Sequence, residues 1–133
     1  MLKIADMRML LLHSDFIEYK VTKKTKIAEE IDKNSGRAEE VLVVFVAVEP
    51  GDSGKLNQIV DSIKEVQEWT KANKLFFYPY AHLSDNLSKP AEAIEVLNKL
   101  AKTFGAERAP FGWYKHFTIS VKGHPMAEFS RRI

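Results

Sequence analysis

A lysine at position 115 lies where an alternating segment is otherwise apolar. If residues 113–121 form a strand, successive side chains point to opposite faces. The residues that share a face with Lys115 are Trp113, Phe117, Ile119 and Val121. Burial disfavours an ammonium unless an anion, a carbonyl or a hydroxyl lies beside it, and lysines held in this way are frequent site residues. A later strand start or a bulge would let the side chain reach water instead, and the pattern leaves both interpretations open.

His82 and Glu128 are the next candidates for chemistry. His82 follows the apolar segment 75–80, at the carboxyl edge where open α/β sheets place their ligands. The alternative is a polar loop histidine close to Ser84 and Asp85. Glu128 follows a turn and could bind a substrate, although the sequence alone favours a solvated charge.

Several other chemistries lack the residues they need. The chain has no cysteine, which excludes disulfides, thiolate nucleophiles and thiolate metal sites. His13, Ser14 and Asp15 have the composition of a catalytic triad, but adjacent residues point in different directions, so a turn after a strand is the better interpretation. The histidines have no metal-binding spacing, and no glycine-rich phosphate loop or nucleophile elbow occurs. We therefore predict no metal and no cofactor.

The segments that would position these residues predict an α/β (α+β) fold with a mixed β-sheet and two main helices. The predicted strands are 8–13 and 16–21, joined as a hairpin, then 41–48, 75–80 and 113–121, and the predicted helices are 55–71 and 90–105. The uninterrupted apolar run 41–48 favours a central strand covered on both faces. Residues 22–40 are rich in charge and predict an exposed connection, and Glu128 belongs to a short tail. Two strand–helix–strand units would pack the helices on the sheet through right-handed crossovers.

Length and composition set the broad class. A chain of 133 residues fits one domain, residues 1–133, with one core. Hydrophobic residues make up 45% and charged residues 29%, which is typical of a folded globular protein. The net charge of +2 permits a polyanionic partner without indicating one. No apolar run approaches the roughly 20 residues that cross a bilayer and no signal peptide is recognisable, so we expect a cytoplasmic protein with no membrane contact.

Three stretches of sequence together resemble one family. They are residues 11–19 (LLHSDFIEY), 78–84 (YPYAHLS) and 109–130, which begins APFGWYK and continues to KGHPMAE and Ser130. The combination resembles the N-terminal editing domain of archaeal threonyl-tRNA synthetase, over nearly the whole chain. The resemblance implies a fold like that of D-aminoacyl-tRNA deacylase and the hydrolysis of serine wrongly attached to tRNA(Thr). Such a step is needed because one methyl group discriminates only about 10- to 200-fold.

The resemblance also implies which residues act. Lys115 and His82 correspond to the catalytic positions, where they would orient and polarise the ester while water attacks. The implied substrate-binding residues are Tyr114, Glu128, Pro79, Tyr80, Ala81, Val48 and Phe111. The family is described as relying on the 2′-hydroxyl of the terminal adenosine, which agrees with the lack of a credible protein nucleophile. Threonine would be spared because its methyl group clashes with the pocket or because it displaces the attacking water.

The implied partners are the aminoacyl 3′ end of tRNA(Thr), a second copy of the chain, and a synthetase catalytic domain in cis or in trans. Because the chain ends at Ile133, we expect either an excised fragment or a module acting in trans. A D-aminoacyl-tRNA deacylase is the alternative enzyme, although its Ser-Gln-x-Thr motif is absent. A non-catalytic module that binds tRNA or dimerises, and a purely structural domain, are the alternatives outside the enzymes.

Overall fold

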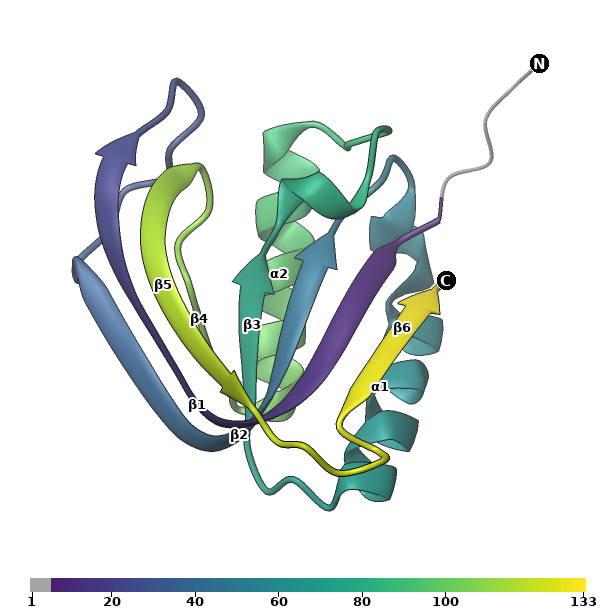
Figure 1. The fold of residues 1–133 in the computed structure, drawn as a ribbon. Helices are drawn as coiled ribbons and strands as arrows, with labels where there is room; N and C mark the ends of the chain where they lie inside the picture. The colour runs from purple at the N-terminus through teal and green to yellow at the C-terminus, as the bar shows by residue number, and fades with distance from the viewer. Residues whose placement is uncertain (1–5) are drawn as a thin grey trace.

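A computed structural model describes residues 6–133 of the chain (Figure 1). Its strands are β1 (Arg8–Lys24), β2 (Ser35–Ala47), β3 (Leu75–Pro79), β4 (Glu107–Arg108), β5 (Trp113–Val121) and β6 (Glu128–Arg132). Its α-helices are α1 (Leu56–Thr70) and α2 (Pro90–Phe104), and short 3-10 helices cover Asp52–Lys55 and Ala81–Leu83. Both α-helices pack on the same side of the sheet (Figure 1).

All six strands form one mixed sheet, ordered β4-β3-β2-β1-β5, with β6 also paired to β1. The pairs β2–β3 and β3–β4 are parallel, whereas β1 runs antiparallel to β2, β5 and β6. β6 pairs with residues 8–12 of β1 and β5 pairs with residues 14–24, so the two strands follow one another along the same edge of β1. The prediction of a mixed sheet with two main helices is confirmed.

The sheet carries a core on each face. On one face, Leu42, Val44 and Phe77 pack against apolar residues of both helices, such as Ile63 and Leu97. On the other face, a second cluster joins the central strands to β5, which curls over them. Its members include Val43, Phe45, Phe76, Tyr78, Phe117 and Ile119. β2 is therefore buried on both faces along its carboxyl half, as its apolar run predicts.

The helices follow directly from their sequence patterns. In α1 the buried residues Ile59, Ile63, Val66 and Thr70 recur at helical spacing. In α2, Pro90 occupies the first turn and Gly105 ends the helix with a φ of 59°. The predicted ranges 55–71 and 90–105 agree with the observed helices to within one residue at each end.

The predicted hairpin at Ser14-Asp15 is wrong, because β1 runs through these residues as one strand of 17 residues. The turn-forming residues are accommodated as an irregularity, since the pairing of β1 with β5 shifts register between Ser14 and Phe16. Ser14 is buried, and its hydroxyl donates a hydrogen bond to the Leu12 carbonyl. A local hydrogen bond to the backbone thus satisfies the serine inside the strand.

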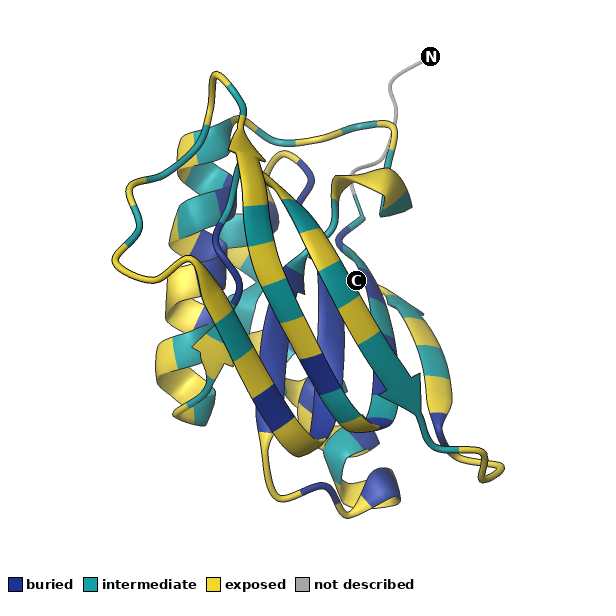
Figure 2. Cartoon of the chain, turned by 60° about the vertical axis from the view of Figure 1, so that its left-hand side comes forward, coloured by how far each residue is buried: buried dark blue, intermediate teal, exposed yellow. Residues whose placement is uncertain are grey.

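Three further expectations need correction. Residues 22–40 are an exposed connection only in part, because β1 continues to Lys24 and β2 already begins at Ser35. The tail around Glu128 is strand β6. In the second strand–helix–strand unit, the strand that pairs with β3 after α2 is the short β4, whereas β5 crosses to the far edge and pairs with β1. The outer parts of β1, β2 and β5 alternate exposed residues with partly or fully buried ones (Figure 2), so one face of these strands packs on the second cluster while the other faces solvent.

Candidate active site

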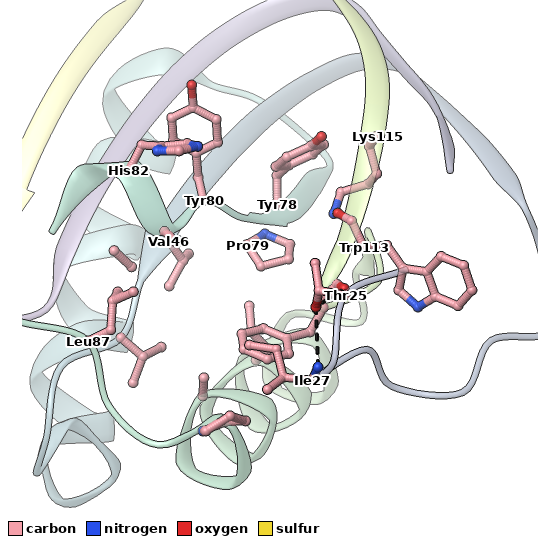
Figure 3. Close-up of a pocket in the computed structure, with 18 of the residues that line it drawn as sticks. Thr25, Ile27, Val46, Tyr78, Pro79, Tyr80, His82, Leu87, Trp113 and Lys115 are labelled. Atoms are coloured by element: carbon pink, nitrogen blue, oxygen red, sulfur yellow. Dashed lines mark hydrogen bonds between the residues drawn. The ribbon is translucent and has the colours of Figure 1, made fainter. Parts of the chain in front are cut away.

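A cavity of about 500 Å³ opens where the parallel strands β2 and β3 end. This is the edge at which open α/β sheets place ligands. Its base is largely apolar, from Val46 of β2, from Val48 just after this strand, and from Ala93 and Leu97 of α2. The polar groups stand on two walls (Figure 3): the Lys115 side chain comes from β5, and His82 comes from the 3-10 turn after β3. A cation and an imidazole therefore share an apolar cavity of ligand size.

Lys115 points inward and is anchored by backbone oxygens. Its Nζ donates to the carbonyl oxygen of Pro110 at 2.8 Å and to that of Trp113 at 2.9 Å. The same atom lies 5.1 Å from the ring centroid of Tyr78, a cation–π distance. An ammonium has three N–H donors, so two fixed carbonyl partners leave one donor for a ligand. Of the two interpretations of the sequence, the structure has the inward-facing lysine with carbonyl partners, and its side chain is partly buried.

The surroundings of Lys115 change its protonation. Burial lowers the pKa of Lys115 to about 8; the carboxylate of Glu29 acts in the opposite direction, and the guanidinium of Arg108 lowers the pKa further. Lys115 is thus cationic at neutral pH and titrates much nearer to neutrality than an ordinary lysine.

The opposite wall is a short turn that carries His82. The imidazole is exposed and meets the ring of Tyr80 edge to face, with centroids 5.3 Å apart. Glu49, a fully buried residue two positions after the end of β2, holds this turn in place. Its carboxylate accepts a hydrogen bond from the Ser84 hydroxyl. The N–H of Asn86 in turn donates to the Ser84 hydroxyl at 2.9 Å.

Most of the residues named from the sequence meet in this cavity. The lining includes Val48, Pro79, Tyr80, Ala81, His82, Phe111, Tyr114 and Lys115. Tyr114 is at the rim and 62% exposed. Glu128 is the exception, because it is an exposed residue of β6, opposite Leu12 of β1, and does not line the cavity. The structure of one chain therefore brings together every predicted site residue except Glu128.

Sequence reasoning missed the part of the site contributed by residues 25–29. Thr25 and Ile27 line the cavity, and the Thr25 hydroxyl donates to the carbonyl oxygen of Gly112 at 2.6 Å. The indole N–H of Trp113 donates to the carbonyl oxygen of Glu29 at 2.8 Å. These residues lie in a charged stretch without periodicity, so no local signal distinguishes them from an exposed connection.

The chemical groups of the site favour electrostatic chemistry over covalent catalysis. The two aliphatic hydroxyls in the lining, from Thr25 and Ser88, each donate to a backbone carbonyl and have no imidazole as base. Within residues 6–133, no group of three or more His, Cys, Asp or Glu residues could hold a metal ion. The arrangement offers a fixed cation, an exposed imidazole and an apolar surface, which can orient and polarise a carbonyl.

The sequence places these features in a known family. Residues 7–133 match the family model of the archaea-specific editing domain of threonyl-tRNA synthetase. The chain belongs to this family. Editing domains proofread translation by hydrolysing wrongly charged aminoacyl-tRNA. The chain is therefore an aminoacyl-tRNA deacylase, of the kind that forms the editing domain of a threonine–tRNA ligase.

Curated relatives agree with the assignment of this editing domain. The chain is 46% identical to the threonine–tRNA ligase of Methanosarcina mazei and 48% identical to that of Methanoregula boonei. Each match covers 96% of the chain and 22% of the relative, so the editing domain spans about a fifth of the length of these ligases.

Solved structures support the fold of the editing domain. It superposes with a TM-score of 0.65 and 11% identity on a structure described as a probable eukaryotic D-amino acid tRNA deacylase, covering 96% of this chain and 98% of the other. It also matches the c-Myc DNA unwinding element binding protein with a TM-score of 0.60 and 12% identity, over 93% and 97% of the two chains. At these identities the likeness concerns the fold alone, and it confirms the expected deacylase-like fold. No helix within residues 6–133 is long and apolar enough to cross a membrane.

Proposed function

We propose that this editing domain hydrolyses L-serine from tRNA(Thr) and spares L-threonine. The observation that carries the proposal is the placement of a fixed cation, Lys115, and an imidazole, His82, on two walls of one apolar cavity. Serine and threonine differ by one methyl group, and a binding site distinguishes such a pair by only about 10- to 200-fold, so a separate hydrolytic step is needed. A second site that hydrolyses the smaller product removes this limit.

In the proposed reaction, water attacks the carbonyl carbon of the seryl ester. The bond from that carbon to the 3′-oxygen of the terminal adenosine breaks, the 3′-oxygen takes up a proton, and serine and tRNA leave. The free N–H of Lys115 binds the carbonyl oxygen and stabilises the negative charge that develops on it. His82 orients the ester from the opposite wall, and backbone groups of Pro79, Tyr80 and Ala81 hold the aminoacyl group. The neighbouring 2′-hydroxyl of the tRNA assists the water.

The partners follow from the same proposal. The cavity receives the aminoacyl 3′ end of tRNA(Thr), and the domain acts in the cytoplasm with a synthetase catalytic domain, in cis or in trans. We infer a homodimer as the working state. Tyr114 is exposed at the rim, and Glu128 lies outside the cavity of its own chain, so a second copy is the means by which Glu128 would reach a site.

The test is the deacylation of L-seryl-tRNA and L-threonyl-tRNA, both on tRNA(Thr), by the purified domain. We expect rapid loss of serine, slow loss of threonine, and large decreases in Lys115→Ala and His82→Ala. His116→Ala is the matched control, because His116 adjoins Lys115 on the exposed face of β5 and does not line the cavity. A 2′-deoxy terminal adenosine should abolish the reaction. Hydrolysis of D-aminoacyl esters in place of the L-seryl ester would support the D-aminoacyl-tRNA deacylase, and a folded domain that hydrolyses none of these esters would leave a tRNA-binding module.

A further inference from the structure

The segment 25–29 is bound to residues 111–113, where β5 begins, by hydrogen bonds in both directions. The N–H of Thr25 donates to the carbonyl of Gly112 at 3.0 Å, and the N–H of Glu29 donates to the carbonyl of Phe111 at 3.1 Å. In the other direction, the Trp113 indole donates to the carbonyl of Glu29. The two segments therefore form one wall of the cavity.

The carboxylate of Glu29 is the polar centre of this wall. It receives both terminal nitrogens of Arg108, at 2.6 and 2.7 Å, in a two-point ion pair. It also accepts the backbone N–H of Phe111 at 2.5 Å. The side chains of the pair are only 18% and 15% exposed, and Asn98 of α2 fixes the guanidinium at 3.0 Å. Glu29 thus joins β4, α2 and the start of β5.

The groups that Glu29 fixes are next to the groups that fix Lys115. The carboxylate of Glu29 accepts the N–H of Phe111, which directly follows Pro110. The backbone carbonyl of Glu29 accepts the indole N–H of Trp113. Pro110 and Trp113 supply the two carbonyl oxygens that hold the ammonium of Lys115. The position of Nζ is therefore set by backbone that Glu29 holds in place.

We infer that Glu29 is a positioning residue for the deacylation reaction, which it serves by fixing the backbone carbonyls that hold Lys115 and by placing a negative charge in the same wall of the cavity. The inference rests on the proposed function and deepens it. Glu29 does not line the cavity and makes no contact with a substrate there.

Burial is the main influence on the charge of Lys115, and three groups from three elements act beside it. Glu29, from the connection after β1, favours the cation, whereas Arg108 of β4 opposes it. The ring of Tyr78 on β3 faces the ammonium and stabilises it through the π-system, while burial raises the pKa of the Tyr78 hydroxyl so that the phenol stays neutral. Removing the charge of Glu29 therefore lowers the pKa of Lys115, and removing the charge of Arg108 raises it.

The first experiment is a direct titration of Lys115 by NMR of its side chain in the wild-type domain, Glu29→Gln and Arg108→Gln. We expect a lower midpoint in Glu29→Gln and a higher one in Arg108→Gln. Glu30→Gln is the matched control, because Glu30 is the next residue in the chain and is exposed. A charge effect shifts the Lys115 midpoint in opposite directions in the two variants. Simple loosening of the cavity wall would shift the midpoint in the same direction in both. Unchanged midpoints in folded variants overturn the inference, whatever the activity of the wild type.

The second experiment is the pH dependence of seryl-tRNA(Thr) hydrolysis, corrected for spontaneous ester hydrolysis. If Lys115 acts as a cation, the ratio of Glu29→Gln to wild-type rate should fall several-fold between about pH 6.5 and about pH 8.5. Glu29→Asp keeps the charge but shortens the reach, so it should keep the wild-type pH dependence with a lower rate. A wild-type domain that hydrolyses no seryl ester refutes the proposed function alone, because the titration still decides the role of Glu29.

Discussion

The Nζ atom of Lys115 and the carbonyl oxygen of Pro110 lie 2.8 Å apart across the turn that begins β5. The turn contains Gly112, whose φ of 82° returns the chain so that Lys115 faces the carbonyls that precede it. The lysine therefore binds backbone of its own segment, and its position depends on that local shape. This contact makes the lysine a fixed donor in place of a mobile surface cation.

Replacing Lys115 by methionine should greatly decrease editing and preserve the fold. Loss of a donor to the developing oxyanion costs about 10²- to 10³-fold in rate. The folded pKa of Lys115, about 8, lies below the ordinary 10.5, so this lysine makes the wild type gain stability as pH rises between these values. Lys115→Met should lack this gain. Urea unfolding of both proteins at pH 7.5 and pH 10 measures it, and an equal gain in the two would contradict it.

Gly112→Ala should damage both the fold and the site. A Cβ at this position would lie 2.5 Å from the carbonyl oxygen of Ile27 and 2.6 Å from Cα of Ala28, both backbone atoms that cannot rotate away. The positive φ adds strain of about 1–3 kcal/mol for a non-glycine residue. We expect a lower urea midpoint and a decrease in seryl-ester hydrolysis. Gly123→Ala is the control, because nothing lies within 4 Å of its Cβ and its stability should be close to that of the wild type.

Glu49→Gln should loosen the turn that carries His82. Burial alone would raise the pKa of Glu49, but hydrogen bonds from Ser84 and from the N–H of Asp6, with the charge of Arg8, hold it below its ordinary 4.5. Because one oxygen becomes an NH₂ that cannot accept these bonds, a cost of about 1–3 kcal/mol is expected. Urea unfolding and the KM for seryl-tRNA(Thr) measure the two effects.

The pH dependence of this variant gives a separate check. A lowered folded pKa contributes stability at neutral pH that is lost as pH falls below 4.5, so the difference between wild type and Glu49→Gln should shrink in acid. A difference that stays constant from pH 7 to pH 3.5 would refute the assignment. Glu39→Gln, at an exposed carboxylate of β2, should behave like the wild type.

The two imidazoles of His13, within β1, and His124, in the connection before β6, should act as an acid-sensitive contact. His13 Nδ1 and His124 Nε2 lie 2.8 Å apart. Because His124 Nδ1 accepts the N–H of Met126, the other ring nitrogen, Nε2, is the one that donates to His13. Burial, followed by His124 and Lys122, lowers the pKa of His13 below 6.5. Neutral His13 therefore contributes stability above this value, and the contribution is lost as pH falls below 6.5 and the folded state must take up a proton that it binds less readily than the unfolded state.

Hydrogen exchange of the Met126 amide measures this contact. We expect faster opening of the amide at pH 5.5 than at pH 7.5 after correction for the intrinsic exchange rate, and no such change in His13→Phe. His116→Gln, on the exposed face of β5, is the control. Equal protection at the two pH values in the wild type would argue against the contact.

Local pattern predicted the central part of the fold. The apolar run 41–48 was confirmed because its burial is continuous, and the two amphipathic helices because their burial recurs at helical spacing over many residues. The outer part escaped prediction because residues 35–40 are polar and pair with β1 through specific contacts. Arg37, for example, forms an ion pair with Glu18 at 2.7 Å and lies 4.3 Å over the ring of Phe16. Contacts between residues so far apart leave no periodic signal in either segment.

The same distinction applies to the candidate site. Lys115 was recognised because a charge in an apolar face contradicts the pattern around it, and His82 because it follows a strand. Glu29 could not be recognised, since its partners lie 79 and 82 residues away at Arg108 and Phe111. The roles implied by the family resemblance remain predictions for the experiments above.

The single long strand β1 governs when the sheet can be completed. It belongs to the first part of the chain, yet one of its two edges is covered only by β5 and β6, which are the last strands. During synthesis, that edge stays an open ladder of N–H and C=O groups until residues 113–132 have emerged. Folding therefore depends on contacts of long sequence separation, which form slowly. A ribosome that pauses before β5 would leave exposed a strand edge that can pair with another nascent chain.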